Sequence, residues 1–368
     1  QIGGLGVMSV TALVSFFMGR TITVRERLEM SASLSLDDIS GIVRLMREVM
    51  LFTAAIELAG TALLSIRFIP QFGVPEGLWK AFFHAVSAFC NAGFDLMGQR
   101  EAFSNLSDYA QDPLVNLVII ALIVMGGLGF LVWRDLRANR KWNRLSVHTR
   151  LVLIMTALLL IGGALAIFVL EYSNPQTLGN MPVGNRVLAS LFQATTCRTA
   201  GFNTIDQGAL RSGTAVICIL LMFVGGSSGS TAGGIKTTSV AVLILAAWSV
   251  LRSRRDITVF HRRIEERLVM QAVALVMAAL GLILTGSFIL YTADNVSVER
   301  ALYETVSAFS TTGLSENLTP TLGVISKCWL ILEMYLGRIG ILTLGAAVFT
   351  RRIFEPKIRY PESKVIVG

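Results

Sequence analysis

The sequence contains few of the residues on which most enzymes and secreted domains depend. Of its 368 residues only 15% are charged, 3 are histidines and 4 are cysteines. The cysteines are widely spaced and form no CxxC pair, which excludes a disulfide framework, so we expect free thiols. The histidines, His84, His148 and His261, lie in separate segments. No His/Cys/Asp/Glu group has the spacing of a metal or catalytic site, and we expect no enzymatic activity.

Apolar residues are present in excess. Hydrophobic residues make up 53% of the chain, and the mean hydropathy of +0.65 is outside the usual range for soluble domains. A bilayer core needs roughly 20 mostly apolar residues per helix, and a spanning backbone satisfies its hydrogen bonds internally as helix. We therefore predict an all-α polytopic membrane protein. Its apolar segments are residues 2–18, 43–69, 114–132, 151–170, 215–224, 240–251, 268–291 and 329–349.

Basic residues gather in four segments between these apolar runs. Residues 20–47, 134–150, 252–267 and 351–364 hold 5, 6, 6 and 5 of the 32 Lys and Arg residues. Because cytoplasmic loops are enriched in Lys and Arg, we place all four segments inside the cell. The net charge of +8 is thus a signal of membrane topology, and no basic face indicates a nucleic-acid partner.

The chain also contains an internal repeat. Three short segments align without gaps around one glycine: SAFCNAGFDL at 87–96, TTCRTAGFNT at 195–204 and SAFSTTGLSE at 307–316. Their glycines, Gly93, Gly201 and Gly313, are 108 and 112 residues apart. A second motif follows each one, as VMGGLGFL from Val124, FVGGSSGS from Phe223 and YLGRIGIL from Tyr335. These spacings predict units of helix, short helix, loop and helix.

The opening QIGGLGVM matches the second motif, so we interpret the chain as beginning inside its first repeat. A fourth loop glycine is therefore expected upstream of Gln1. The predicted units are residues 1–40 (second membrane helix of an incomplete repeat 1, with a cytosolic loop), 41–147 (repeat 2), 148–264 (repeat 3), 265–350 (repeat 4) and 351–368 (a cytosolic tail).

Such repeats can surround a pore. Non-helical backbone at membrane depth is tolerated where protein buries it or it lines water, and converging loops can offer carbonyl oxygens to a dehydrated cation. The preceding short helices, expected at 78–89, 187–196 and 301–309, would direct partly negative C-terminal ends at the axis. The predicted pseudo-fourfold pore would take its ion filter from Asn91, Ala92, Gly93, Thr199, Ala200, Gly201, Thr311, Thr312 and Gly313.

The stretch GGSSGSTAGGIKTT interrupts the inner helix of repeat 3, whereas we expect the other inner helices to continue. Gly and Ser are poor helix formers, so this stretch should leave the helix and lie across the pore. Close packing of membrane helices is the alternative. A phosphate-binding loop is excluded because Ile235 separates Gly234 from Lys236.

Several charged residues accompany these motifs. Arg338 lies within a membrane helix, where it could bind carbonyls of the interrupting stretch and oppose cation passage, or pair with Glu333 or Glu57. Lys236 could bind an acidic group or extend towards the cytoplasm. Arg198 precedes a predicted filter loop and is expected to brace the backbone of that loop rather than contact the ion. Asp95, Asp206 and Glu316 follow the three loops, where they could concentrate cations or form ordinary solvated surface.

On the three glycine loops, the GGSSGSTAGGIKTTS stretch, GRIG and the terminal RYPESKVIVG, the chain resembles the Ktr/Trk/HKT superfamily of K⁺ transporters, and within it the KtrB-type membrane subunit. The resemblance implies K⁺ uptake at the cell membrane of a bacterium, a homodimer, and a cytosolic KtrA-type ring through which nucleotides act. It also implies an intramembrane gate loop. The gate residues would be Gly225, Gly226, Ser227, Ser228, Gly229, Ser230, Thr231, Ala232, Gly233 and Gly234, with Lys236 and Arg338.

The ion and the transport mode remain open at this point. In plant relatives a serine in place of the first-repeat glycine accompanies Na⁺ preference, whereas the glycines present here favour K⁺. A Na⁺-preferring or cotransporting relative, and Na⁺ as an activator, are the alternatives. An alternating-access antiporter would have inverted repeats and a midplane carboxylate, for which Glu57 and Glu333 are candidates. The parallel repeats disfavour it.

Overall fold

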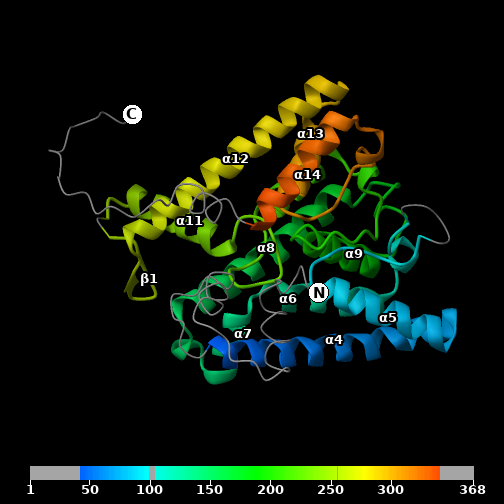
Figure 1. Cartoon of the computed structure of the whole chain (residues 1–368), viewed down its shortest axis with the longest axis horizontal. Helices are drawn as coiled ribbons and strands as arrows, with labels where there is room; N and C mark the ends of the chain where they lie inside the picture. The colour runs from blue at the N-terminus through cyan, green and yellow to red at the C-terminus, as the bar shows by residue number, and fades with distance from the viewer. Residues whose placement is uncertain (1–41, 99–103, 255, 340–368) are drawn as a thin grey trace.

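The structure, a computed structural model, describes residues 42–98, 104–254 and 256–339, with the side chains of 42–46 left out (Figure 1). The predicted helix at 2–18, the end of the helix at 329–349 and the C-terminal tail lie outside these residues.

The described chain is built from helices, together with one two-stranded hairpin. Repeat 2 holds α4 (Ile42–Phe72), α5 (Val74–Phe89), α6 (Pro113–Gly127) and α7 (Phe130–Ala138). Repeat 3 holds α8 (Val147–Glu171), α9 (Val183–Thr196), α10 (Ser212–Phe223) and α11 (Thr237–Leu251). Repeat 4 holds α12 (Glu266–Asp294), α13 (Val298–Phe309) and α14 (Val324–Ile339). Short 3-10 turns are Ser107–Tyr109, Trp142–Arg144, Gln207–Ala209 and Thr319–Thr321, and the hairpin pairs β1 (Thr258–Val259) with β2 (Arg262–Arg263).

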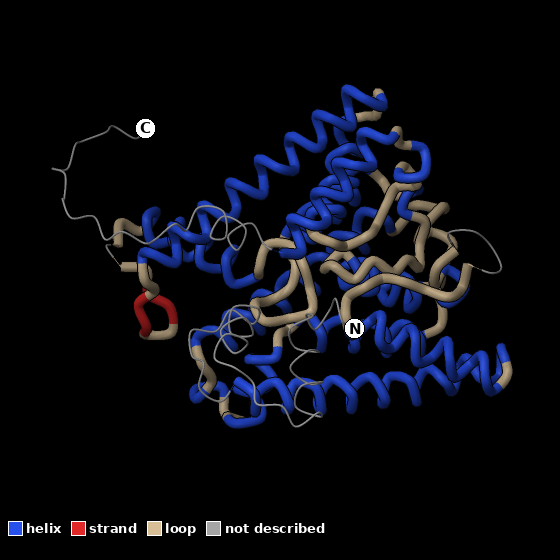
Figure 2. The backbone as a smooth tube through the Cα atoms, viewed as in Figure 1, coloured by secondary structure: helices blue, strands red, loops and turns tan. Residues whose placement is uncertain are grey.

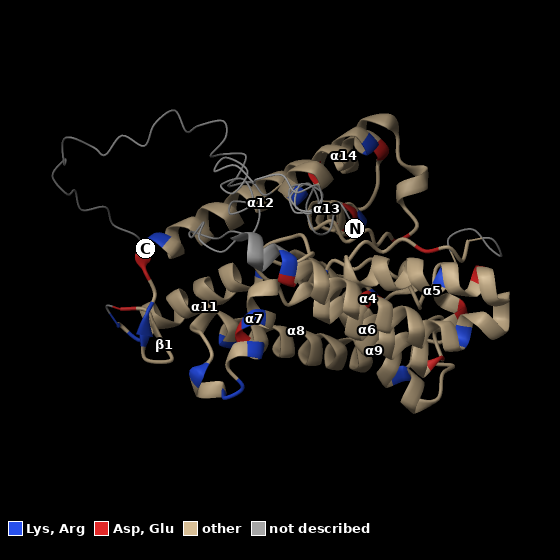
Figure 3. Ribbon diagram, turned by 60° about the horizontal axis from the view of Figure 1, so that its bottom comes forward, with Lys and Arg blue, Asp and Glu red and all other residues tan. Residues whose placement is uncertain are grey.

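Among the described residues, a helix of membrane-spanning length occurs near the start of each of the predicted repeats 2, 3 and 4. In the described residues α4, α8 and α12 are long and apolar enough to cross a bilayer, and the bent pair α6–α7 adds a fourth candidate span. The β1–β2 hairpin and the connection after α7 carry clusters of Lys and Arg (Figure 3). Both belong to segments that the sequence predicts on the cytoplasmic side.

A shorter helix packs against each long one: α5 against α4, α9 against α8 and α13 against α12. These three end where the sequence predicts, at Phe89, Thr196 and Phe309, but begin three or four residues earlier than expected. In α5 a proline lies in the first turn, and Pro182 is the N-cap of α9. Proline lacks an N–H and has a fixed φ, and both properties suit the first residues of a helix. The two helices therefore start at these prolines, before the apolar residues from which their starts were predicted.

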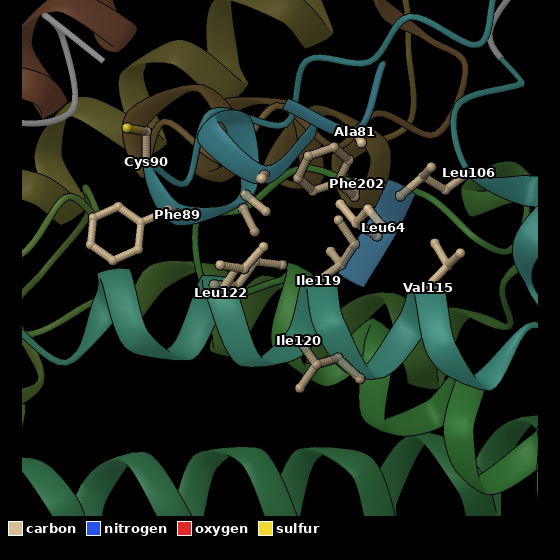
Figure 4. Close-up of a cluster of buried hydrophobic side chains, with 14 of the residues drawn as sticks. Leu64, Ala81, Phe89, Cys90, Leu106, Val115, Ile119, Ile120, Leu122 and Phe202 are labelled. Carbon is tan, nitrogen blue, oxygen red and sulfur yellow. The ribbon is translucent and has the colours of Figure 1, made fainter. Parts of the chain in front are cut away.

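The non-helical segments between these helices run through the middle of the helical body (Figure 2). One of them is anchored in a hydrophobic cluster formed by α4, α5 and α6 (Figure 4). Phe202, from the loop after α9, is fully buried there with Leu64 and Ile119. A loop of repeat 3 is therefore held by the core of repeat 2, which fixes the position of one repeat relative to the other.

The expectation that the inner helix of repeat 2 continues unbroken is wrong. The helix predicted at 114–132 is divided into α6 and α7, which are bent by 91°. Gly129 between them has a φ of 91°, a conformation that glycine adopts without strain. A Cβ there would lie 2.6 Å from the carbonyl oxygen of Ser228, so the break is formed where another segment presses against it.

Candidate functional site: three glycine loops above a crossing loop

The three helices α5, α9 and α13 end in loops of one backbone conformation, named here loop 2 (residues 91–93), loop 3 (199–201) and loop 4 (311–313). The first residue of each has a positive φ (Asn91 50°, Thr199 67°, Thr311 54°), and so has the glycine at the third position (Gly93 71°, Gly201 82°, Gly313 87°). The middle residues Ala92, Ala200 and Thr312 do not. Alternation in the sign of φ lets consecutive carbonyls face the same side, as a cation-coordinating backbone needs.

Backbone hydrogen bonds explain the first positive φ. The N–H of Ala92 donates to the carbonyl of Ser87 (2.8 Å), and the N–H of Thr312 donates to that of Ser307 (2.9 Å). Bonds of this kind close a helix around a left-handed residue. In loop 3 the N–H of Ala200 bonds Thr196 instead, at 3.0 Å. Each loop thus begins directly at the helix end, where unpaired carbonyls carry partial negative charge.

The loops pack against one another in chain order. A Cβ on Gly93 would lie 2.5 Å from the carbonyl oxygen of Ala200, and a Cβ on Gly201 would clash with the carbonyl oxygen of Thr312. The same face of Gly313 meets no described atom within 4 Å. Glycine is therefore required in loops 2 and 3 by close approach as well as by φ.

The residue that follows the glycine of loop 3 or loop 4 is buried against the preceding repeat. Phe202 is buried in the core of repeat 2, and Leu314 is buried in a cluster that includes Ile167 and Cys218 of repeat 3. Phe94, at the corresponding place after loop 2, is 70% exposed among the described residues. The three loops therefore form an arc, with an open face on Gly313 at one end and on Phe94 at the other.

The glycine- and serine-rich stretch forms a loop between α10 and α11, named here the crossing loop (residues 224–236). Its two arms meet in an isolated bridge between Val224 and Ile235. Hydroxyl pairs link Ser227 to Thr237 (3.0 Å) and Ser228 to Thr238 (3.2 Å). The stretch has left the helix, as its composition predicts.

The crossing loop docks on the break between α6 and α7. The N–H groups of Ser227 and Thr231 donate to the carbonyls of Gly127 and Gly126 at 3.0 and 3.3 Å, and the N–H of Phe130 donates to the carbonyl of Gly229 at 2.9 Å. These bonds satisfy carbonyls that a helix end leaves unpaired. The break in the inner helix of repeat 2 thus forms the surface on which the crossing loop of repeat 3 packs.

The crossing loop also lies directly against the ends of the helices that carry loops 2 and 4. The single hydroxyl proton of Thr231 is shared between two acceptors, the carbonyl of Phe89 (2.9 Å) and Oδ1 of Asn91 (3.2 Å). Gly233 faces loop 4 so closely that a Cβ would lie 2.6 Å from the carbonyl oxygen of Ser310. The segment therefore spans from repeat 2 to repeat 4, beneath the three loops.

Three cationic side chains hold this loop by its carbonyls. Arg338 on α14 donates to Thr231 at 2.8 Å, as the sequence predicts for a carbonyl partner. Arg198, buried beside loop 3, donates to Gly225 at 3.2 Å, so it braces the crossing loop rather than its own loop. Lys236 donates to Ala232 at 2.8 Å. Neither role expected of Lys236, an acidic partner or extension towards the cytoplasm, agrees with this contact.

Glu333, proposed from the sequence as one partner of Arg338, accepts a hydrogen bond from Trp329 at 2.9 Å. The acidic residues after the loops hold the outer connections together. Asp95, which is half-buried, accepts from Asn105 (2.9 Å), and Asp206, which is exposed, accepts from Asn317 (3.1 Å).

Glu316 lies 3.6 Å from the guanidinium of Arg300. Burial raises the pKa of Glu316 to about 7, against the opposing effect of Arg300. Its charge therefore changes near neutral pH, three residues after Gly313 of loop 4.

The sequence identified two glycines of the second motif, Gly126 and Gly337, without predicting their role in packing. A Cβ on Gly126 would clash with the carbonyl oxygen of Phe89, and a Cβ on Gly337 would clash with that of Phe309. The first glycine of the second motif thus lets an inner helix reach the end of a loop-bearing helix. The signal was present, because the two occupy the same place in VMGGLGFL and YLGRIGIL.

Among the described residues no group of three or more His, Cys, Asp or Glu side chains could hold a metal ion. The four cysteines are free, and three of them are buried. The site offers backbone oxygens and hydroxyls, which suit binding and passage of a cation rather than bond-making chemistry.

Comparisons with known proteins found related sequences along the whole chain. A family model described as TrkH, cation transport protein, matches residues 1–357. The Ktr system potassium uptake protein B of Bacillus subtilis is 41% identical over 369 residues, covering 100% of this chain and 81% of that protein. The potassium/sodium uptake protein NtpJ of Enterococcus hirae is 35% identical, with the same shares covered.

A solved structure supports the fold independently. The crystal structure of the potassium transporter TrkH from Vibrio parahaemolyticus superimposes with a TM-score of 0.69 at 16% identity, covering 94% of this chain and 70% of that one. The chain is thus similar to transport proteins of bacterial membranes along nearly its whole length.

Proposed function

Because this chain belongs to the TrkH family of cation transport proteins, and is a KtrB-type membrane subunit rather than an enzyme, we propose that it conducts K⁺ into the cell through a filter made by loops 2, 3 and 4. The observation that carries the proposal is the shared alternation of φ in three loops packed side by side above a crossing loop. Carbonyls facing one side can replace the water around a cation.

A pore of this kind needs a fourth loop. The open face of Gly313 and the exposed Phe94 support a position for it between loops 4 and 2. The faces of Gly93 and Gly201 each meet the next loop, and Phe202 and Leu314, which correspond to Phe94, are both buried. Four loops around an axis would give one ion several equivalent oxygen ligands.

The crossing loop is proposed as the gate. It lies beneath the filter loops and carries three cationic side chains at its carbonyls, Arg198, Lys236 and Arg338. Positive charge in a low-dielectric pore repels a cation strongly, so the loop blocks passage by charge as well as by volume. Opening requires its withdrawal and the loss of these hydrogen bonds.

Relatives of this chain are named as parts of a Ktr system, which supports a partner subunit. We propose that this partner is a cytosolic KtrA-type ring that carries the nucleotide site, and that the chain itself forms a homodimer. One relative is named a potassium/sodium uptake protein, so Na⁺ as activator or cosubstrate is the second candidate. Competition of K⁺ and Na⁺ against Rb⁺ uptake distinguishes the two.

The filter is tested by Gly313→Ser, assayed as Rb⁺ uptake by cells that lack their own K⁺ uptake systems. The variant should lower K⁺ over Na⁺ discrimination, because Gly313 has a φ of 87°. Gly281→Ser on α12 is the matched control, since neither glycine has a described atom within 4 Å of its Cβ position. Unchanged ion competition in Gly313→Ser would count against the filter.

The gate is tested by deleting residues 228–233. Flux should rise and depend less on a regulatory partner, whereas reduced transport by a folded protein would contradict a gating role. The antiporter alternative makes a separate prediction, namely strict proton exchange that is lost in Glu57→Gln.

A further inference from the structure

The three glycine loops differ at their first position, where loop 2 has Asn91 and the other two have Thr199 and Thr311. All three residues adopt a positive φ. Asparagine tolerates this conformation better than threonine does. The two threonines show, however, that the backbone does not require asparagine, so Asn91 needs another explanation.

The side chain of Asn91, in loop 2, contacts two other segments at once. Its Nδ2 donates to the carbonyl oxygen of Arg198 (3.3 Å) and to the hydroxyl of Thr199 (3.5 Å), both in the turn that forms loop 3. Its Oδ1 accepts from the hydroxyl of Thr231 in the crossing loop, at 3.2 Å, and shares that proton with the carbonyl of Phe89 at 2.9 Å. The residue is only 7% exposed, so these contacts are shielded from water and strengthened by the low local dielectric.

These bonds form part of a continuous chain. Arg338 holds the carbonyl of Thr231, the Thr231 hydroxyl reaches Asn91, and the Asn91 amide reaches the carbonyl of Arg198. The guanidinium of Arg198 in turn holds Gly225 at the start of the crossing loop. The contacts therefore run from the crossing loop through loop 2 to loop 3 and back.

We propose that Asn91 is a specificity-determining residue that couples the position of the crossing loop to ion selection by loops 2 and 3. The inference rests on the proposed function, since it assumes that these loops select the ion. While the crossing loop is in place, Thr231 holds the Asn91 amide in the orientation that binds Arg198. When the loop withdraws, Oδ1 loses a donor, the amide is free to turn, and the carbonyl of Arg198, directly before loop 3, loses its restraint.

Such coupling is reciprocal, because a loop position that changes ion affinity must itself respond to the bound ion. The filter would then bind K⁺ and Na⁺ with a ratio that depends on the gate.

The test is a double-mutant cycle of Asn91→Thr and Thr231→Val in the full chain, reconstituted in lipid vesicles and assayed by competition of K⁺ and Na⁺ against Rb⁺ uptake. Threonine at position 91 is compatible with the fold, as Thr199 and Thr311 have the same backbone conformation. With Asn91 present, Thr231→Val should lower K⁺ over Na⁺ discrimination about fivefold, the value of one hydrogen bond. In the Asn91→Thr background the same change should have less than about a twofold effect, because the two side chains act through one contact.

Thr238→Val is the matched control. Its hydroxyl bonds Ser228, within the same region but away from the three loops. Its effect should be the same with Asn91 present and in the Asn91→Thr background. Equal effects of Thr231→Val in both backgrounds would overturn the coupling. Failure of the filter assignment itself is recognised separately, because Gly313→Ser would then leave ion competition unchanged.

Discussion

The second motif has a glycine at the same position in repeats 2, 3 and 4, but this glycine contacts a different kind of partner in repeat 3. Gly126 and Gly337 bring α6 and α14 under the carbonyl ends of α5 and α13, so close that neither position has room for a methyl group. The corresponding Gly225 faces Gly233, the opposite arm of the crossing loop. One motif thus serves helix packing in two repeats and loop closure in the third.

The residues that follow the motif explain the difference. After Gly129 the chain continues as Phe-Leu-Val-Trp, which can restart a helix at once. After Gly226 it continues as Ser-Ser-Gly-Ser-Thr-Ala-Gly-Gly, where each glycine costs a helix about 1 kcal/mol relative to alanine. Repeat 2 therefore bends and repeat 3 forms a loop, and the bend provides the docking place for that loop.

The largest expected effect is a loss of stability when a methyl group is added at the glycines that contact the ends of α5 and α13. Gly126→Ala and Gly337→Ala each place a methyl group against a backbone carbonyl, which cannot move aside as a flexible side chain does. Each should destabilise the protein by about 3 kcal/mol or more, as overpacking at a rigid site does. Thermal unfolding in detergent measures this.

Gly127→Ala is the control, because its Cβ would lie 3.8 Å from the nearest atom, the Nδ2 of Asn91. Equal stability of Gly126→Ala and Gly127→Ala would contradict the packing of α6 under α5.

A smaller effect is expected from the cations that hold the crossing loop. Arg338→Gln weakens the attachment of the loop to α14, a charge-assisted hydrogen bond to the carbonyl of Thr231. Rb⁺ flux without the regulatory partner should rise about tenfold, since such bonds contribute roughly 1.5–3 kcal/mol.

Lys236→Gln sharpens the same comparison, because the Lys236 bond stays within the crossing loop and its loss leaves the attachment to α14 in place. Its flux should rise about twofold or less. A larger rise in Lys236→Gln than in Arg338→Gln would show that attachment to α14 is not what holds the gate.

The smallest effect concerns the outer mouth. With a pKa of about 7, Glu316 is charged above neutral pH and neutral below it; burial is the main cause, Glu299 and Glu304 raise the pKa further and Arg300 lowers it. Apparent affinity for Rb⁺ should therefore weaken about twofold between about pH 8 and about pH 6, as the attracting charge is lost. Stability moves the opposite way, because a raised pKa favours the protonated fold and its contribution is lost as the pH rises through about 7.

Glu316→Gln should abolish the change in affinity with pH, whereas Asp95→Asn should leave it. A pH dependence that persists in Glu316→Gln would assign it to another group.

Local patterns in the sequence predicted much of this molecule. Apolar runs located the helices, and the ends of α5, α9 and α13 were predicted to the residue from the three aligned loops. The crossing loop was predicted as non-helical from its Gly and Ser content. Errors occurred where a neighbour decides the outcome: the sequence around Gly129 reads as continuous helix, and its bend is visible only with Ser228 and Gly229 in place.

Composition and local patterns are enough to predict the membrane class and the loops that need glycine, because composition and backbone freedom are properties of a few adjacent residues. Tertiary structure alone decided that the crossing loop lies beneath loops 2 and 4, that Lys236 turns back onto its own loop, and that Asn91 joins three segments. These contacts connect residues more than 100 positions apart or depend on side-chain direction. No local pattern encodes such distances, because they are fixed only when the helices pack.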